Sequence, residues 1–352
     1  YEIPASLVGL EMCIRDRTSA DAVDVCLVEF AGSFGFFASH SEALSSTYKQ
    51  TYEEIVLAGY KSWHDPIKLE ELNQELTTVT IQAIEQLLQK EGLKPTDIRS
   101  VGFSGHTIYH DAEQSIQLGC PQTLANALQI NVISDFRNFD MRSGGLGAPL
   151  VPPFHHYLYE EYSDSGLVIN IGGIANATFL NQGCIELATD IGPGNCLIDW
   201  VASNFFNCPF DANGSLAAQG SVNIPLLENL QNSLEKLTYP RADDKSLYYK
   251  LLDQHMTTIN NYDLLRTVTE LTAIAIENFV HECHKPDTII VHGGGTNNEF
   301  LMLLIEEKLG QELWVDHKVP SQYVESAAFA FLAFLVRGKK FTFEKGNQLT
   351  VK

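Results

Sequence analysis

The order of strand-like and helix-like segments predicts an α/β protein with mostly parallel sheets. Three apolar segments run into glycine-rich turns, at residues 167–173, 184–194 and 289–295. Each half of the chain opens with a strand, a turn and a second strand, which suggests a duplicated α/β unit with a cleft between the halves. The chain has 352 residues, which is long enough for two domains with sizeable cores.

Strands and helices are expected throughout the first half. Two segments have apolar residues at spacings of three and four, which is typical of helices, and Gly92 should end the second of them. The expected strands are residues 6–10, 23–30, 98–103 and 131–134, and the expected helices are residues 48–60, 69–91 and 123–128. Residues 143–154 are rich in Gly and Pro, which predicts a turn-rich connection and a domain boundary near residue 160.

The second half continues the same alternation. Three strands are expected across residues 167–190, followed by a helix at 196–206 and by helices within the polar region 223–280. A strand at 287–292, a helix at 298–309 and a short strand at 313–316 come next. Residues 324–336 are apolar on nearly all faces, which predicts a buried helix.

The charge balance excludes several kinds of partner. The chain has 44 acidic and 23 basic residues, for a formal net charge of -21. Nucleic acids and anionic membranes bind cationic surfaces, so we expect neither as a partner. A phosphate ligand remains possible, because backbone amides and Mg²⁺ can hold phosphate.

The cysteines and the apolar segments indicate a cytoplasmic protein. Seven cysteines are scattered without paired spacing, which favours reduced thiols. No segment approaches the roughly 18 uninterrupted apolar residues of a membrane span. The apolar segment at residues 5–10 is shorter than the about 7–15 residues expected in a signal peptide, so we expect none.

The glycine turns and nearby carboxylates could serve phosphoryl transfer, which needs backbone donors and carboxylates for Mg²⁺. Asp190 follows a strand and precedes a Gly-Pro-Gly turn, whose N–H groups we expect to be free to face an anion. Candidate donors are Gly172 and Gly173, Gly192 to Gly194, and Gly293 to Gly295, and candidate carboxylates are Asp21, Asp135, Asp140 and Asp190. Taken singly, each glycine group can be a tight turn and each Asp a helix cap or Asx-turn. Asp199 is expected to be structural or solvated.

Other chemistries have less support. The sequence lacks G-x-S-x-G and G-x-x-x-x-G-K-[ST], so neither a serine hydrolase nor a P-loop protein is indicated. His281, Cys283 and His284 lack further ligands at zinc spacing, and no residue is assigned as a metal ligand.

Several longer motifs carry a family resemblance. Residues 135–155, DFRNFDMRSGGLGAPLVPPFH, strongly resemble the anhydro-N-acetylmuramic acid kinase family. So do NIGGIAN at 170–176, TDIGPGN at 189–195, HGGG at 292–295 and YVESAAFA at 323–330. The motifs follow one another in the family's order, and the resemblance spans about residues 7 to 335.

The resemblance implies the acetate-and-sugar-kinase/Hsp70/actin fold, with two ribonuclease H-like domains that close on ATP across an interdomain cleft. The domains would be residues 1–160 and 161–320, with a helix at 321–340 packing back toward the first. The implied reaction converts ATP, water and 1,6-anhydro-N-acetylmuramic acid to N-acetylmuramic acid 6-phosphate and ADP, in cell-wall amino-sugar recycling. Mg²⁺ as cofactor and a homodimer are further expectations. The alternatives are a non-catalytic sugar- or nucleotide-binding relative and a different sugar kinase.

The resemblance also implies residue roles. Asp190 would activate water for attack on the anomeric carbon. Residues implied in ATP binding are Thr18, Ser19, Asp21, Val23, Asp24, Gly172, Gly173, Gly192, Gly194, Gly293, Gly294 and Gly295. Residues implied in sugar binding are Thr107, Asp135, Arg137 and Glu325.

The first turn departs from the family pattern G-L-M-S-G-T-S-x-D-G-x-D. After Gly9 and Leu10, seven residues (11–17) stand where the family has three, and Arg17 and Ala22 replace glycines. Because Arg cannot approach phosphate with its backbone as glycine does, the departure predicts reduced kinase activity. One hypothesis is that residues 11–17 are a foreign insertion resembling a translated sequencing adapter, and the other is a genuine longer loop. The family's S-H-G-Q-T also differs from Phe103 to Thr107 here.

Overall fold

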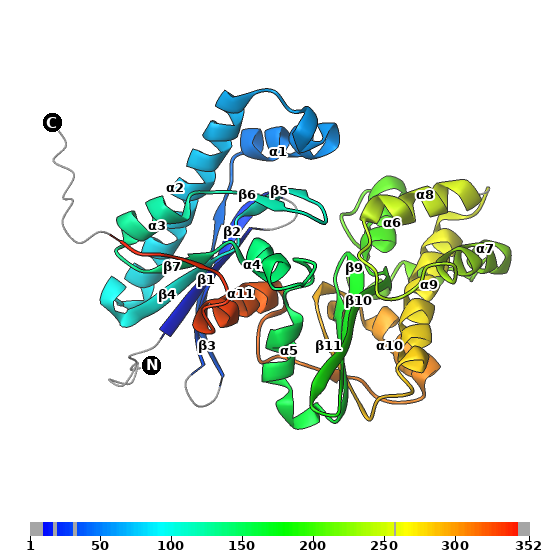
Figure 1. Cartoon of the computed structure of the whole chain (residues 1–352). Coiled ribbons are helices and arrows are strands. Elements are labelled where there is room, and N and C mark those ends of the chain that lie inside the picture. The colour runs from blue at the N-terminus through cyan, green and yellow to red at the C-terminus, as the bar shows by residue number, and fades with distance from the viewer. Residues whose placement is uncertain (1–9, 17–19, 31–33, 257, 344–352) are drawn as a thin grey trace. The chain divides into compact units, whose positions relative to one another are not determined.

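The computed structural model describes residues 10–16, 20–30, 34–256 and 258–343 (Figure 1). The chain divides into two units: unit 1 comprises residues 1–154 and 318–352, and unit 2 comprises residues 155–317. Each unit contains one large sheet. Among the described residues, no helix is both long and apolar enough to cross a membrane.

The sheet of unit 1 has the order β13-β7-β4-β1-β2-β3. Its strands are β1 (Leu10–Asp16), β2 (Ala22–Glu29), β3 (Gly35–Ala43), β4 (Ile98–Phe103), β7 (Val132–Ser134) and β13 (Lys339–Phe341). Strands β1, β4 and β7 are parallel, whereas β2 is antiparallel to both β1 and β3. A separate hairpin consists of β5 (His106–His110) and β6 (Ser115–Leu118).

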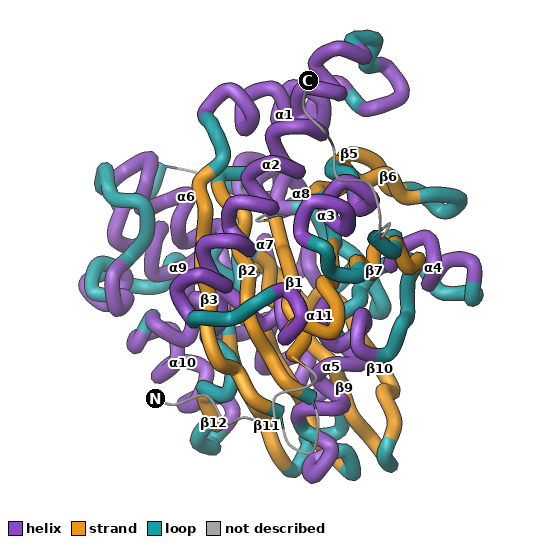
Figure 2. The backbone as a smooth tube through the Cα atoms, turned by 90° about the vertical axis from the view of Figure 1, so that its left-hand side faces the viewer, coloured by secondary structure: helices purple, strands orange, loops and turns teal. Residues whose placement is uncertain are grey.

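Helices cover both faces of this sheet. They are α1 (Ser46–Ala58), α2 (Pro66–Glu91), α3 (Pro121–Leu128), α4 (Phe136–Arg142) and α11 (Val324–Phe334), and α5 (Pro152–Leu158) spans the unit boundary. Helix α2 lies over β2 and β3, and Figure 2 shows these strands running side by side with β1. Alternate residues such as Met12 and Val25 enter the core with α1 to α3. Helix α11 packs on β1, β2 and β4.

Unit 2 repeats the strand order of unit 1. Its sheet, β10-β9-β8-β11-β12, consists of β8 (Ser165–Ile171), β9 (Ile174–Asn181), β10 (Cys184–Pro193), β11 (Thr288–His292) and β12 (Trp314–Val315). Strands β8, β11 and β12 are parallel, and β9 is antiparallel to its two neighbours. When the β5–β6 hairpin and β13 are left out, the strands of both units follow the same order across the sheet. Numbered along the chain within each unit, this order is third, second, first, fourth and fifth. The shared order confirms the predicted duplicated α/β unit.

The helices of unit 2 are α6 (Cys196–Phe205), α7 (Ile224–Leu234), α8 (Lys245–His255), α9 (Asn261–Glu282) and α10 (Glu299–Leu309). The long helix α9 packs against α6, α7, α10 and β10. Its apolar side chains, including Leu265, Val268 and Phe279, are buried in one core with those of β8 to β11. The core therefore fixes β10 and the turn that follows it.

The first strand differs from the prediction. Residues 11–17 were expected in a long turn, but residues 10–16 form β1, between β2 and β4. Residues 10–13 are all buried, as expected for a strand in the middle of a sheet that is covered on both faces. Of the expected strand at residues 6–10, only Leu10 lies within the described residues, where it begins β1. Strands β3 and β13 were not predicted.

Candidate active site

Two glycine turns of unit 2 form one backbone-bonded structure. Strands β8, β10 and β11 run in the same direction, so their carboxyl ends meet at one edge of the sheet, which is where open α/β sheets bind ligands. There the Asn195 N–H donates to the Gly172 carbonyl (2.8 Å), and the N–H groups of Gly194 and Cys196 donate to the Gly173 carbonyl (3.0 and 2.9 Å). The two turns therefore hold each other in place.

This arrangement corrects the expectation that the N–H groups of the Gly-Pro-Gly turn are free for an anion. The amides of Gly194 and Asn195 are used by the neighbouring turn. A Cβ on Gly194 would lie 2.2 Å from the Gly172 carbonyl oxygen, so only glycine permits this approach. The hydroxyl of Thr272 on α9 donates to the Gly194 carbonyl (2.9 Å), which ties the joined turns to the core.

The third glycine turn follows β11 beside the end of β8. Gly293 has a φ of 99°, and a Cβ there would lie 2.5 Å from Oδ1 of Asn170. A Cβ on Gly295 would lie 2.2 Å from Cγ2 of Ile171. Gly294 is exposed and has no atom within 4 Å of its Cβ position. The turn is therefore anchored at its two outer glycines and open at the middle one.

A lysine lies beside the joined turns. Lys245 begins α8, and its Nζ would be 3.0 Å from a Cβ on Gly173. Burial raises the pKa of Asp199 on α6 to about 6, and the charge of Lys245 opposes this rise. The exposed Lys245 ammonium thus supplies positive charge at the turns, and Asp199 is half-buried near it.

Asp190 lies in β10, three residues before that strand ends and opposite Asn176 on β9. Its N–H donates to the Arg241 carbonyl (3.0 Å), and its Oδ2 accepts a hydrogen bond from the Asp243 N–H (2.7 Å). The side chain is half-buried, and burial is the main cause that raises the pKa of its carboxyl. A fixed carboxylate with a raised pKa is suited to act as a general base.

Sequence reasoning missed Arg241, Asp243 and Lys245. They follow a Tyr-Pro pair within the region interpreted only as polar with helices. The available signal was the charged run Arg-Ala-Asp-Asp-Lys at 241–245, placed between two helices. The periodicity of the sequence could not connect this run with Asp190, because the contact joins residues 53 positions apart.

The predicted sugar-binding residues belong to unit 1. Asp135 directly follows β7 with a φ of 59°, and its carboxylate accepts hydrogen bonds from Asn138 (2.6 Å) and Arg142 (3.2 Å). Arg137 on α4 donates to the Gly147 carbonyl (2.9 Å). Thr107 lies in β5, after the carboxyl end of β4, whereas Glu325 lies in the first turn of α11.

The predicted residues of the first turn are only partly described. Thr18 and Ser19 lie outside the described residues. Asp21 is exposed just before β2, whereas Val23 and Asp24 lie in β2 with no exposed surface.

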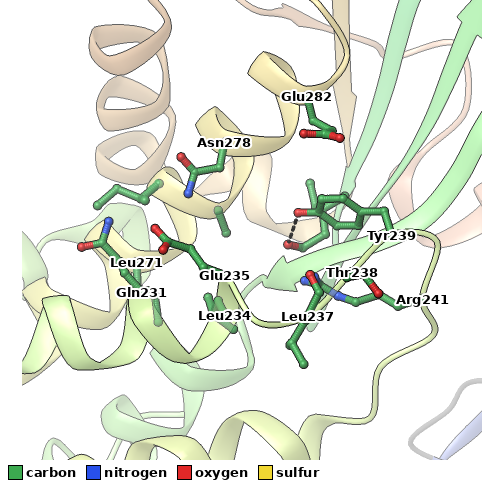
Figure 3. A pocket seen from close by; sticks show the side chains of 13 residues that line it. Gln231, Leu234, Glu235, Leu237, Thr238, Tyr239, Arg241, Leu271, Asn278 and Glu282 are labelled. Atoms are coloured by element: carbon green, nitrogen blue, oxygen red, sulfur yellow. Dashed lines mark hydrogen bonds between the residues drawn. The ribbon is translucent and has the colours of Figure 1, made fainter.

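Unit 2 also has a pocket of about 440 Å³ between α7, α9 and residues 237–241 (Figure 3). Apolar side chains such as Leu234 and Ile274 line it together with the acidic Glu235 and Glu282. Its wall includes Ile191, the residue after Asp190, but none of the predicted site residues. In the described part of the chain, no group of three or more His, Cys, Asp and Glu residues is arranged to hold a metal ion.

Known proteins resemble this chain over nearly its whole length. The sequence model of the family "Anhydro-N-acetylmuramic acid kinase" matches residues 10–338. A protein with that name from Gamma-proteobacterium EBAC31A08 is 31% identical over 326 residues, covering 90% of this chain and 89% of the relative. Its namesake from Idiomarina loihiensis is 34% identical over 350 residues, covering 95% and 93%.

A solved structure supports the fold. Component A of the (R)-2-hydroxyglutaryl-CoA dehydratase of Acidaminococcus fermentans has a TM-score of 0.50 at 12% identity, covering 94% of this chain and all of that chain. At this identity the likeness concerns the fold alone, and it agrees with the predicted two-domain α/β class. The family match and the extent of the relatives decide the assignment: this chain belongs to the anhydro-N-acetylmuramic acid kinase family.

Proposed function

We propose that this chain is an ATP-dependent kinase that hydrolytically opens 1,6-anhydro-N-acetylmuramic acid and phosphorylates its O6. The products are N-acetylmuramic acid 6-phosphate and ADP. The observation that carries the proposal is the position of Asp190 beside the joined glycine turns, in a chain of this kinase family. The alternatives, a non-catalytic relative and a different sugar kinase, have no comparable support.

The glycine turns and Lys245 would bind the phosphates. Gly294 is open to a ligand, and Gly173 lies beside the Lys245 ammonium. The approach of phosphate to backbone requires positions without a Cβ, and a cation neutralises part of its charge. ATP supplies the γ-phosphoryl group, and Thr18, Ser19, Asp21, Val23 and Asp24 are the proposed contacts from unit 1.

Mg²⁺ would be held chiefly by phosphate oxygens and water. Proteins commonly bind this ion through one or two carboxylates together with substrate phosphates. That mode needs no dedicated protein cage, so it is compatible with the lack of a three-ligand group among the described residues. The homodimer stays a prediction, and so does the cytoplasmic location that the cysteines and the apolar segments indicate.

Asp190 would act as the general base. Its carboxylate takes a proton from water while the water oxygen bonds to the anomeric carbon and the bond from that carbon to O6 breaks. O6 then bonds to the γ-phosphorus as the bond from phosphorus to ADP breaks. The raised pKa makes the Asp190 carboxylate a stronger proton acceptor than an ordinary aspartate. Thr107, Asp135, Arg137 and Glu325 are the proposed sugar contacts.

Turnover in ¹⁸O-labelled water tests the proposal. The purified chain, ATP, Mg²⁺ and the anhydro-sugar should yield a sugar phosphate with one ¹⁸O at C1, measured by mass spectrometry immediately after quenching. A different sugar kinase would phosphorylate an ordinary sugar hydroxyl without taking oxygen from water. A non-catalytic relative would bind the ligands and form no ADP, so either result would overturn the proposal.

The same assay tests the role of Asp190. Asp190→Asn should lower turnover by about 10²–10⁴-fold, the usual loss when a positioned general base is removed. Binding of ATP should be nearly unchanged, because the glycine turns remain. Asp253→Asn, an exposed change on α8, is the matched control. Turnover of Asp190→Asn within a few-fold of the parent would reject this residue as the base.

A further inference from the structure

Residues 237–244, here called the flanking segment, connect α7 with α8 and lie along β10, the outer strand of the unit 2 sheet. The Arg241 N–H donates to the Thr189 hydroxyl (2.8 Å), and the Asp190 N–H donates to the Arg241 carbonyl (3.0 Å). The Tyr239 hydroxyl donates to the Ile191 carbonyl (3.5 Å, Figure 3). Three consecutive residues of β10 are therefore bonded to this segment.

One further bond reaches the carboxylate itself. The backbone N–H of Asp243 donates to Oδ2 of Asp190 at 2.7 Å. The orientation of the Asp190 carboxylate thus depends on where the flanking segment places residue 243.

The Asp243 side chain is fixed by two donors. Its Oδ2 accepts from Nε of Arg241 (2.8 Å) and from the hydroxyl of Tyr248 on α8 (2.5 Å). The Asp243 and Arg241 side chains are only 5% and 10% exposed. Arg241 also donates to the Leu237 carbonyl (3.3 Å) and lies over the Tyr239 ring, 4.8 Å from its centroid. A buried ion pair with these additional bonds holds a single geometry.

We propose that Asp243 is a positioning residue for Asp190: held by Arg241 and Tyr248, it fixes the backbone N–H that orients the carboxylate. This inference rests on the proposed role of Asp190 as the base. It assigns a function to the buried charges of the flanking segment, which do not themselves contact the reacting atoms.

The surrounding charges indicate what removal of Asp243 should do. The charged groups that act on Asp190 are Asp243 and Arg241. On the neighbouring elements, Asn176 of β9 lies opposite Asp190 and Ala275 of α9 lies against Gly192, and both are uncharged. The hydrogen bond from the Asp243 N–H lowers the pKa of Asp190 more than the Asp243 charge raises it, and the charge of Arg241 also lowers it. Displacement of this N–H should therefore raise the pKa of Asp190, whereas loss of the Asp243 charge alone would lower it.

The decisive variant is Asp243→Asn, which keeps the size of the side chain and the backbone N–H but removes the charge. We expect kcat to fall roughly tenfold, part of the about 10²-fold loss that a misplacement of 1 Å can cause. The KM for ATP should stay within about twofold, and the acid limb of the pH profile of kcat should move to higher pH because the displaced N–H no longer lowers the pKa of Asp190. Tyr248→Phe should lower kcat by a smaller factor and should move the acid limb of the pH profile only slightly. Asp253→Asn should change neither kcat nor the position of the acid limb.

A titration separates this inference from the proposed function. The carboxyl ¹³C signal of Asp190, assigned by its loss in Asp190→Asn, should titrate at higher pH in Asp243→Asn than in the parent. Titration at lower pH would mean that the Asp243 N–H keeps its place and only the charge acts, which would overturn the inference. An unchanged titration and an unchanged kcat would overturn the inference while leaving an active kinase. A shifted titration in a chain that forms no product would instead count against the proposed function alone. If Asp243→Asn does not fold, Arg241→Lys and Tyr248→Phe provide the same two measurements.

Discussion

The first hairpins of the two sheets have the same topology but different chemistry. In unit 2, β8 and β9 are joined at Gly172 and Gly173, whose carbonyls accept three backbone hydrogen bonds from the next turn. In unit 1, β1 precedes a connection that contains Arg17 in place of the family's glycine. The unit 2 turn is closed by glycines and bonded into its surroundings.

The strands before these turns differ as well. Strand β8 carries buried Leu167, Val168 and Ile169 in succession, whereas β1 places Glu11 in the interior with no exposed surface. Neither carboxylate oxygen of Glu11 accepts a hydrogen bond from the described residues, and Nη1 of Arg99 lies 3.4 Å from Oε1. A buried charge without hydrogen bonds is unfavourable. Two sheets with the same strand order can therefore differ in their first strand: that of unit 2 buries apolar side chains, whereas that of unit 1 buries a carboxyl group without hydrogen bonds from the described part of the chain.

Among the changes that bear on this comparison of the two units, the largest effect should come from disturbing the unit 2 turns. Gly194→Ala places a Cβ 2.2 Å from the Gly172 carbonyl oxygen, so the two turns must separate. We expect kcat/KM to fall by about 10²-fold, as for a misplacement of about 1 Å at a reacting centre. Steady-state kinetics with both substrates measures the loss.

Gly183→Asn is the control for this change. Gly183 lies at the other end of the β9–β10 pair, has open space at its Cβ position, and has a φ of 75° that Asn tolerates. If Gly194→Ala and Gly183→Asn are equally active, the joined turns do not position the site.

A second prediction concerns a variant whose first turn in unit 1 again contains glycine, as the turn of unit 2 does. Replacing residues 11–17 with Met-Ser-Gly shortens the chain by four residues, so that, counted back from Thr18, Leu7 would take the position of Glu11. An apolar side chain would then occupy the buried position, and glycine would return to the turn. We expect kinase activity to rise at least about tenfold, equivalent to ~1.4 kcal/mol in the barrier. A coupled ADP assay at saturating anhydro-sugar compares the two proteins, and equal activity would favour a genuine longer segment.

The smallest expected effect concerns the pH dependence of stability. Burial raises the pKa of Glu11 to about 7 from the ordinary value of 4.5, so the folded protein retains a proton that the unfolded chain releases. The contribution of Glu11 to the free energy of unfolding should therefore be most favourable below about pH 4.5 and fall as the pH rises toward 7. Glu11→Gln should remove this fall and leave the protein about 1–3 kcal/mol more stable than the parent at pH 8.

Urea unfolding at several pH values measures this difference. Glu53→Gln, an exposed change on α1, should follow the parent at every pH. Parallel curves for the Glu11→Gln variant and the parent would mean that the Glu11 carboxyl is hydrated or paired in solution.

Most elements could be predicted from the sequence because their signals are local. The apolar spacing at residues 69–91 and the glycine at 92 predicted α2, which spans Pro66–Glu91 and has Gly92 in the left-handed conformation at its end. The strands of unit 2 and their glycine turns were predicted in the same way, and the motifs at 135–155 and 189–195 identified the family. These features depend on residues within a few positions of one another, which one-dimensional periodicity can reveal.

Tertiary structure alone decided which residues surround Asp190. The Asp243 N–H reaches its carboxylate across 53 positions, and the Thr272 hydroxyl reaches Gly194 across 78. Tertiary structure also decided that the amides after Pro193 bond to another turn and that residues 10–16 take the place between β2 and β4. Such contacts depend on how the whole chain packs, because a backbone donor bonds to whichever acceptor the folded core brings near it.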